Sequence, residues 1–179
     1  NLPNSIDKNE RNFSDLDLEK FFLALDEVIK NLIVFRSNEG DSIKIDLENN
    51  SNLISQLLKE VVTLSKKHST KLKDSLNKKI NDLIIDLDKN RLEQEVIYYL
   101  EKIDINEEIV RLQSHLSYFN NILNNEGIEK GKKLGFICQE IGREINTIGS
   151  KANNSEIQSK VVEMKTSLEK LREQVLNIV

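Results

Sequence analysis

Apolar residues recur every three or four positions along most of the chain, which is the spacing of one face of an α-helix. After Ser14-Asp15 this pattern runs to Ile33 and predicts a helix that ends near residues 38–40, with Gly40 as its C-terminal stop. Neither Gly nor Pro occurs from Asp41 to Glu126. The apolar stripe from Leu53 to Leu87 therefore predicts one long helix or two nearly collinear ones.

Shorter helices are predicted in the rest of the chain. A turn at residues 86–90 precedes a helix over 91–102, and Asp104 caps a further helix that residues 124–127 close. Another helix is predicted over 128–149, with Gly149 ending it.

The last helix is expected to start with a capping box of Ser155 and Gln158. Its apolar residues, from Ile157 to Ile178, alternate steps of four and three, as in the seam of a coiled coil. We therefore expect this helix to contact another helix, within or between subunits.

These elements predict an all-α fold of long antiparallel helices and helical hairpins, extended rather than globular. The expected organisation is a disordered lead or linker remnant at 1–14, a long-helix middle region at 15–90 and a helical C-terminal domain at 91–179.

Composition agrees with long amphipathic helices, because 31% of the 179 residues are charged and only 38% are hydrophobic. The net charge of -4 does not indicate a nucleic-acid binder, but charge is unevenly distributed. Seven lysines lie between Lys59 and Lys79, against Glu60 and Asp74. This run either attracts phosphates or, as most charge runs do, forms a solvated helix face. Within it, His68 lies on the apolar stripe and is interpreted as a structural histidine.

The single cysteine, Cys138, excludes an internal disulfide and suits a reducing compartment, so we expect a cytoplasmic protein. It lies on an apolar stripe and is predicted to be a buried small hydrophobe rather than a nucleophile. No zinc-ligand spacing occurs, and no apolar run is long enough to span a membrane.

The stretch from Gly131 to Lys151, GKKLGFICQEIGREINTIGSK, carries the most chemically capable groups. One helical stripe is apolar and predicted to be buried: Leu134, Ile137, Cys138, Ile141, Ile145 and Ile148. The opposite side is predicted to be polar: Glu140, Arg143, Glu144, Thr147 and Lys151. Gly135 and Gly142 share a face, and each costs about 1 kcal/mol of helix propensity relative to Ala. Close approach of another helix or of RNA backbone would explain that cost, and so would sequence drift.

This stretch resembles the C-terminal signature of the YicC-like family of bacterial endoribonucleases, G-[RK]-K-L-D-F-x-x-Q-E-x-N-R-E-x-N-T-x-G-S-K. It departs from the pattern at Gly135, where the family usually has Asp, and at Gly142, where it usually has Asn. Residues 91–96, 104–116 and 161–178 also resemble the family, as does R-x-x-E-G at 36–40. Members carry a further strand-rich N-terminal domain, so we expect this chain to be a fragment.

The resemblance implies an endoribonuclease that depends on a divalent metal, Mn²⁺ or Mg²⁺, and cleaves RNA. It also implies a ring-like homo-oligomer, expected to be a hexamer.

The candidate metal ligands are Glu140, Glu144 and Glu108, because hard cations prefer carboxylate oxygens. His115 is a candidate general base or metal ligand, and the catalytic set is His115, Glu140 and Glu144. The candidate RNA contacts are cationic: Lys132, Lys133, Arg143, Lys151 and Arg111.

Simpler interpretations of the same residues stay open. Glu140, Arg143 and Glu144 also suit a surface ion cluster, and His115 with Glu108, Arg111 and Tyr118 suits a polar helix face. Metal-assisted hydrolysis and attack by the RNA 2′-hydroxyl are both compatible with the candidate residues. The alternative functions are a non-catalytic helical module that binds RNA or assembles subunits, and a coiled-coil scaffold.

Overall fold

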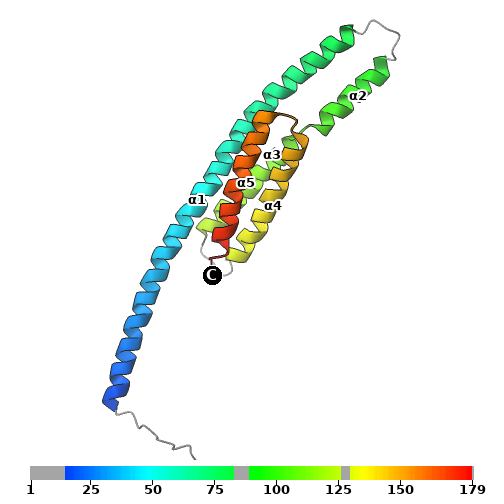
Figure 1. Cartoon of the computed structure of the whole chain (residues 1–179). Helices are drawn as coiled ribbons and strands as arrows, with labels where there is room; N and C mark the ends of the chain where they lie inside the picture. Colours follow the sequence, from blue (N-terminus) through cyan, green and yellow to red (C-terminus); the bar gives the residue numbers. More distant parts are fainter. Residues whose placement is uncertain (1–14, 83–88, 126–129, 179) are drawn as a thin grey trace, which may run out of the picture. The chain divides into compact units, whose positions relative to one another are not determined.

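The computed structural model describes residues 15–82, 89–125 and 130–178, and these are helices joined by short connections, without a strand (Figure 1). The predicted all-α fold is confirmed. The expected lead at 1–14, residues 86–88 of the predicted turn and Gly127 lie outside the described residues. No helix in the described ranges is both long enough and apolar enough to cross a membrane.

Helix α1, Asp15–Asp82, is a single element of 68 residues. Its start at Asp15 confirms the predicted beginning, but the predicted end at Gly40 is wrong. An internal glycine weakens a helix by about 1 kcal/mol relative to alanine, which does not force an end when no proline follows. The second predicted helix is therefore the continuation of the first.

The chain divides into two compact units, Asn1–Asp41 and Ser42–Val179, and the division falls inside α1. In the first unit, the predicted apolar stripe is exposed to solvent. Twelve large apolar side chains between residues 16 and 35 are 41–67% exposed: Leu16, Leu18, Phe21, Phe22, Leu23, Leu25, Val28, Ile29, Leu32, Ile33, Val34 and Phe35.

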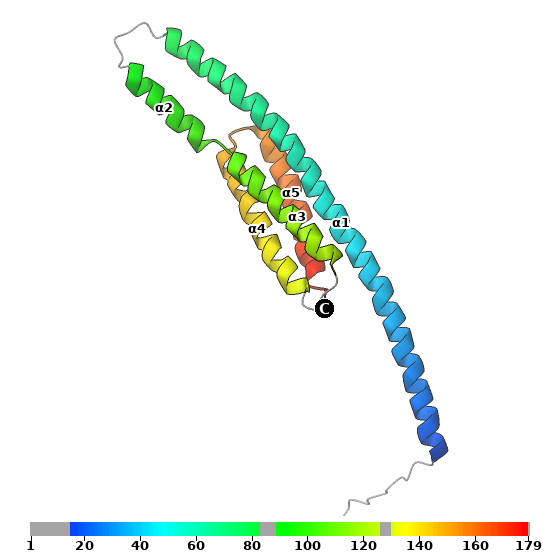
Figure 2. The same cartoon turned by 180° about the vertical axis from the view of Figure 1, so that it is seen from behind.

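The second unit contains the rest of α1 and the other helices: α2 Lys89–Lys102, α3 Asn106–Asn124, α4 Lys130–Lys151 and α5 Ser155–Val175. The helix α2 begins at Lys89, so the predicted turn is wrong at residues 89 and 90. Both views show α3, α4 and α5 side by side, and α4 packs against both of its neighbours (Figures 1 and 2).

One hydrophobic core holds this unit together. The buried residues of α1, from Leu47 to Val61, share it with α3, α4 and α5. The predicted apolar stripe of α4 is buried throughout, and so is the α5 seam from Ile157 to Val175, which confirms a helix–helix contact within the chain. At the edge of the core, the Ser51 hydroxyl of α1 donates to Asn120 Oδ1 of α3 at 2.9 Å.

The ends of α4 and α5 differ from the prediction. Gly149 lies inside α4, which continues to Lys151. The N-cap of α5 is Asn154, whose side chain accepts from the Glu156 and Ile157 amides, so the predicted Ser155 capping box is wrong. The Gln158 amide instead donates to the Ala152 carbonyl at 2.8 Å and ties the α4–α5 connection to the first turn of α5. Asn154 is the N-cap because its side-chain oxygen accepts from two backbone amides that have no partner within the helix.

The start of α3 is close to the prediction. Its N-cap position falls on Ile105, and the preceding Asp104 carboxylate accepts from the Asn106 amide at 3.0 Å.

Glycines allow α5 to approach α4 closely. A Cβ on Gly131 would lie 2.6 Å from the Ile178 carbonyl oxygen, and one on Gly149 would lie 3.0 Å from Val161 Cγ1. At Gly142, a Cβ would lie 2.5 Å from Arg172 Nη2 and 3.1 Å from Leu168 Cδ2. Three glycines of the signature stretch, at positions 131, 142 and 149, are thus explained by the close packing of α5 and the residues that follow it.

Alanine at Gly135 and at Gly142 should affect stability differently. A Cβ on Gly135 meets only Val175 Cγ1, at 3.9 Å, so Gly135→Ala is expected to raise the free energy of unfolding by about 1 kcal/mol. Gly142→Ala should gain none of this, because Leu168 and Arg172 must move. Urea unfolding of the two variants measures the difference, and equal gains would contradict the packing described for Gly142.

Candidate functional site

A partly buried ion pair joins the beginning of α3 to the end of α4. Lys151 Nζ lies 2.7 Å from Glu108 Oε1 and also donates to the Asp104 carbonyl oxygen at 3.2 Å. Glu108 is only 4% exposed, and its second oxygen, Oε2, is buried without a hydrogen-bond partner among the described residues. Each charge also complements its helix, because an acid near an N-terminus and a base near a C-terminus oppose the helix dipole.

The Glu108–Lys151 pair shows how α3 and α4 are aligned, and this alignment locates two other candidate residues. Helices α3 and α4 are neighbours and run antiparallel (Figures 1 and 2). His115 follows Glu108 by seven residues, and Glu144 precedes Lys151 by seven, which is about two helical turns, or roughly 10 Å, in each case. The register therefore places His115 and Glu144 at the same level of the α3–α4 seam.

The burial of these residues agrees with a position in the seam. Glu144 is 5% exposed and His115 is half-buried. The predicted solvent-facing position of Glu144 is therefore wrong. The physical reason is the tight antiparallel contact with α3, which covers more of α4 than its apolar stripe.

Glu140 and Glu144 lie in different environments. The Glu140 side chain is 41% exposed and forms an ion pair of 3.6 Å with Arg143. The surface-cluster interpretation is therefore confirmed for these two residues and wrong for Glu144, which is buried. Within the described residues, no three side chains of His, Cys, Asp or Glu gather into a group that could hold a metal ion. Glu140, Glu144 and Glu108 thus do not form a preassembled ligand set in one chain, and their metal-binding role stays a prediction.

The predicted RNA contacts fall into two groups. Arg111 pairs with Glu107, Arg143 with Glu140 and Lys151 with Glu108, so carboxylates offset three of the five cations. Lys132 and Lys133, by contrast, are exposed near the start of α4. The exposed side chain of Phe136, one turn further, adds an apolar surface on the same helix.

Cys138 is fully buried, as predicted. Burial raises the pKa of its thiol to about 11, although the Arg172 guanidinium opposes this shift. The thiolate is the nucleophilic form, so a raised pKa makes this cysteine a packing residue.

Sequence reasoning named Glu108 and Lys151 but assigned them to separate roles. The signal for their pairing was present: an acid lies in the first turn of one helix and a base in the last turn of the following antiparallel helix. The contribution of the Asp104 carbonyl carried no such signal, because every residue has a carbonyl group.

Comparison with known proteins decides the family. A family model described as the C-terminal part of YicC-like endoribonucleases matches residues 57–179, which include the α3–α4 seam and all of α5 up to the end of the chain. This chain belongs to the YicC-like endoribonuclease family. The resemblance carried by residues 131–151 is thereby confirmed.

Curated relatives agree with this assignment. The chain is 38% identical over 159 residues to the probable endoribonuclease YicC of Clostridioides difficile (strain 630), which covers 87% of this chain and 54% of that protein. It is 32% identical over 173 residues to the probable endoribonuclease YicC of Haemophilus influenzae, which covers 92% of this chain and 58% of that protein. The chain thus spans little more than half the length of the curated relatives that it matches.

Proposed function

We propose that this YicC-like chain forms the helical part of an endoribonuclease that cleaves RNA with the help of a divalent metal ion and acts as a ring-like homo-oligomer, expected to be a hexamer. The observation that carries the proposal is the α3–α4 seam, where a histidine and a buried carboxylate lie at one level, about two helical turns from the Glu108–Lys151 ion pair. The names of the relatives, probable endoribonucleases, supply the reaction class.

In this proposal His115 is the acid–base group. Its imidazole takes the proton from the attacking hydroxyl, which belongs either to water or to the RNA 2′ position. Glu144, level with it in the seam, favours the imidazolium that forms and orients the ring, so Glu144 is a positioning residue. Buried carboxylates act in this way because the charge of a nearby cation is felt more strongly where water is excluded.

Mn²⁺ or Mg²⁺ is the proposed cofactor. The chain offers no three-ligand group among its described residues, but Mg²⁺ is often held by one or two carboxylates together with substrate phosphates and water. Glu140 fits such an open site best, because its carboxylate is accessible, whereas Glu108 and Glu144 are buried. When bound, the ion would stabilise negative charge on the phosphoryl oxygens.

The exposed apolar face of the first unit supports assembly. Leu18, Phe22, Leu25, Ile29 and Leu32 alternate steps of four and three, which is the spacing of a helix–helix seam. Monomeric proteins rarely expose so large a contiguous apolar surface. Sedimentation of the chain and of its Phe22→Asp/Ile29→Asp variant would test whether this face joins subunits.

A non-catalytic RNA-binding or assembly module is the competing proposal. The ion pairs of Arg111 and Arg143 favour its assembly form, because neighbouring carboxylates offset two of the proposed phosphate contacts. The two functions differ in whether RNA is cut.

Cleavage of a labelled RNA by this chain and by a full-length YicC relative, with Mn²⁺, Mg²⁺ or a chelator, tests the proposal. Metal-dependent cutting that Glu140→Gln reduces while RNA binding persists is the expected result. A 2′,3′-cyclic phosphate on the product indicates attack by the RNA itself, and a 5′-phosphate indicates attack by water. Binding without cutting by either protein would leave the module as the function.

A further inference from the structure

The lysine run of α1 lines two hollows that meet at His68. The larger, of about 680 Å³, includes Lys66, His68 and Lys73 of α1 and, across from them, Glu101 of α2 and Asp104. The smaller, of about 190 Å³, lies between Lys67, His68 and Lys71 of α1 and the α4–α5 connection at Asn154. His68 is half-buried, and the lysines of each hollow are exposed. The predicted solvated helix face thus borders two hollows.

The lysines around His68 keep their charge available. In the part of the chain that the structure describes, no ion pair is formed by Lys66, Lys67, Lys71 or Lys73. The opposing carboxylates are Glu101 and Asp104 in the larger hollow and Glu156 in the smaller one. The Asp104 carboxylate already accepts from the Asn106 amide.

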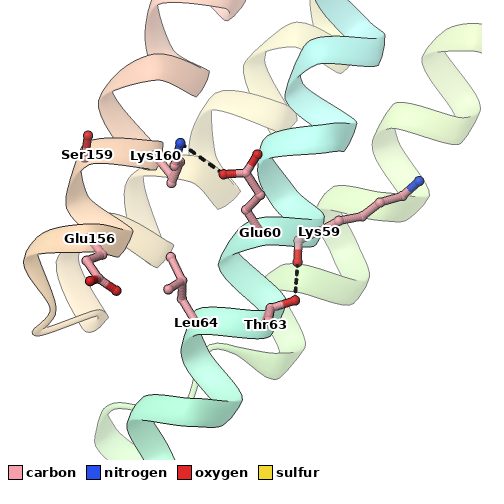
Figure 3. Close-up of a pocket in the computed structure, with 7 residues that line it drawn as sticks. All are labelled: Lys59, Glu60, Thr63, Leu64, Glu156, Ser159 and Lys160. Atoms are coloured by element: carbon pink, nitrogen blue, oxygen red, sulfur yellow. Dashed lines mark hydrogen bonds and ion pairs between the residues drawn. The ribbon is translucent and has the colours of Figure 1, made fainter.

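The adjoining hollow nearer the middle of α1 differs in this respect. There Lys160 of α5 lies 3.0 Å from Glu60 of α1, and this hydrogen bond raises the pKa of Lys160 (Figure 3). That ion pair links α5 to α1, and the charges of Lys160 and Glu60 cancel. Lys160 is therefore less available to a phosphate than the four lysines around His68.

We propose that the two hollows flanking His68 bind the phosphate backbone of single-stranded RNA, with Lys67 and Lys71 on one side and Lys66 and Lys73 on the other. This inference rests on the proposed function, which makes RNA the substrate. Lysine ammonium groups bind phosphates as point charges, and the Ser65 and Ser69 hydroxyls of the larger hollow add hydrogen-bond donors. Among the described residues, neither hollow is lined by Phe, Tyr or Trp, and the only aromatic ring in either is the half-buried His68, so contacts to the backbone dominate and binding depends little on sequence.

The larger hollow lies next to the α3–α4 seam. Asp104 lines the hollow, and its backbone carbonyl accepts a hydrogen bond from Lys151 Nζ. Lys151 in turn pairs with Glu108. An RNA strand held by the lysines thus lies beside the first turn of α3, from which the seam leads to His115.

The salt dependence of RNA binding tests this location. Fluorescence anisotropy of a labelled 2′-O-methyl RNA, which has no free 2′-hydroxyl, is measured with chelator present over a range of salt concentrations. Two double variants, Lys67→Gln/Lys71→Gln and Lys66→Gln/Lys73→Gln, are compared with the control Lys165→Gln/Lys170→Gln, which removes two exposed lysines of α5.

Each double variant of α1 is expected to reduce the slope of log K against log salt by about 1.4, because each lost phosphate contact to a single strand contributes about 0.7. Affinity at 0.1 M salt should fall at least tenfold, equally for uridine-rich and adenosine-rich strands, and the control should behave as the unmodified chain. Unchanged slopes in both α1 variants, with RNA still bound, would overturn the location and leave the proposed function intact. Failure of the unmodified chain and of a full-length relative to bind RNA would overturn both.

Discussion

His115→Ala is expected to slow RNA cleavage by about 100-fold or more while leaving RNA affinity within a factor of two or so. A positioned acid–base group typically contributes 10²–10⁴-fold to a rate, whereas half-buried His115 does not line the lysine hollows and so adds little to binding. Single-turnover cleavage and anisotropy measure the two quantities separately. This expectation applies to whichever form of the protein, this chain or a full-length relative, cleaves RNA.

One further variant and the pH–rate profile identify the role of the histidine. Glu144→Gln removes the buried charge without changing the shape of the side chain, and it should slow cleavage less than His115→Ala does. His115→Ala should also remove the acid-side slope of the pH–rate profile, which a merely structural residue would not do. Full cleavage by folded His115→Ala would exclude His115 as the base. The α3–α4 seam would then serve helix packing only.

Lys151→Met is expected to lower the free energy of unfolding by about 3 kcal/mol. Removal of one partner of a buried ion pair typically costs about 3–5 kcal/mol, because the other charge stays buried without compensation. The lower end applies here, since the Lys151 side chain is 33% exposed and water already screens part of the interaction. Glu108 would then have both carboxylate oxygens unpaired, because Oε2 has no partner now.

A double-mutant cycle separates the pair from the general loss of packing. Lys151→Met/Glu108→Leu should recover most of the stability, because replacing both charges by apolar groups of similar size is often neutral. Lys165→Met, at an exposed site on the same bundle, is the matched control and should change stability by less than about 0.5 kcal/mol. Urea unfolding is measured for five proteins: the unmodified chain, Lys151→Met, Glu108→Leu, the double variant and the control. A Lys151→Met loss as small as that of the control would show that the pair is a surface interaction.

The sequence predicted most of the helices because periodicity is a local property. The stripes of α4 and α5 recur at helical spacing, and each buried residue of these stripes was identified from that spacing alone. Helix ends were less predictable. Gly40 and Gly149 both suggested ends, but a helix continues through a glycine when packing or an unbroken chain supports it, and Asn154 capped α5 where Ser155 was expected.

The candidate site was predictable in its residues and not in its arrangement. His115, Glu144, Glu108 and Lys151 were all named from the family signature and from their chemistry. Their relation depends on the antiparallel register of α3 and α4, which brings residues 43 positions apart in the sequence into one hydrogen bond. A local sequence pattern spans only a few residues and therefore cannot predict a contact between residues this far apart in the sequence. For the same reason the lysine run suggested phosphate binding without indicating the hollows around His68.

By itself the sequence determined the helical class, the buried stripes, the family and the inventory of charged groups, because each of these depends on residue identity and short-range spacing. Tertiary structure alone decided which charges are buried, which are paired and which remain available. Glu144 became a buried carboxylate because α3 covers it, and Lys151 became a structural cation because Glu108 lies within 2.7 Å. The lysines around His68 stayed available because no carboxylate of the described residues forms an ion pair with them. Solvent exposure and long-range contact, which set the strength of every electrostatic interaction, exist only in the folded chain.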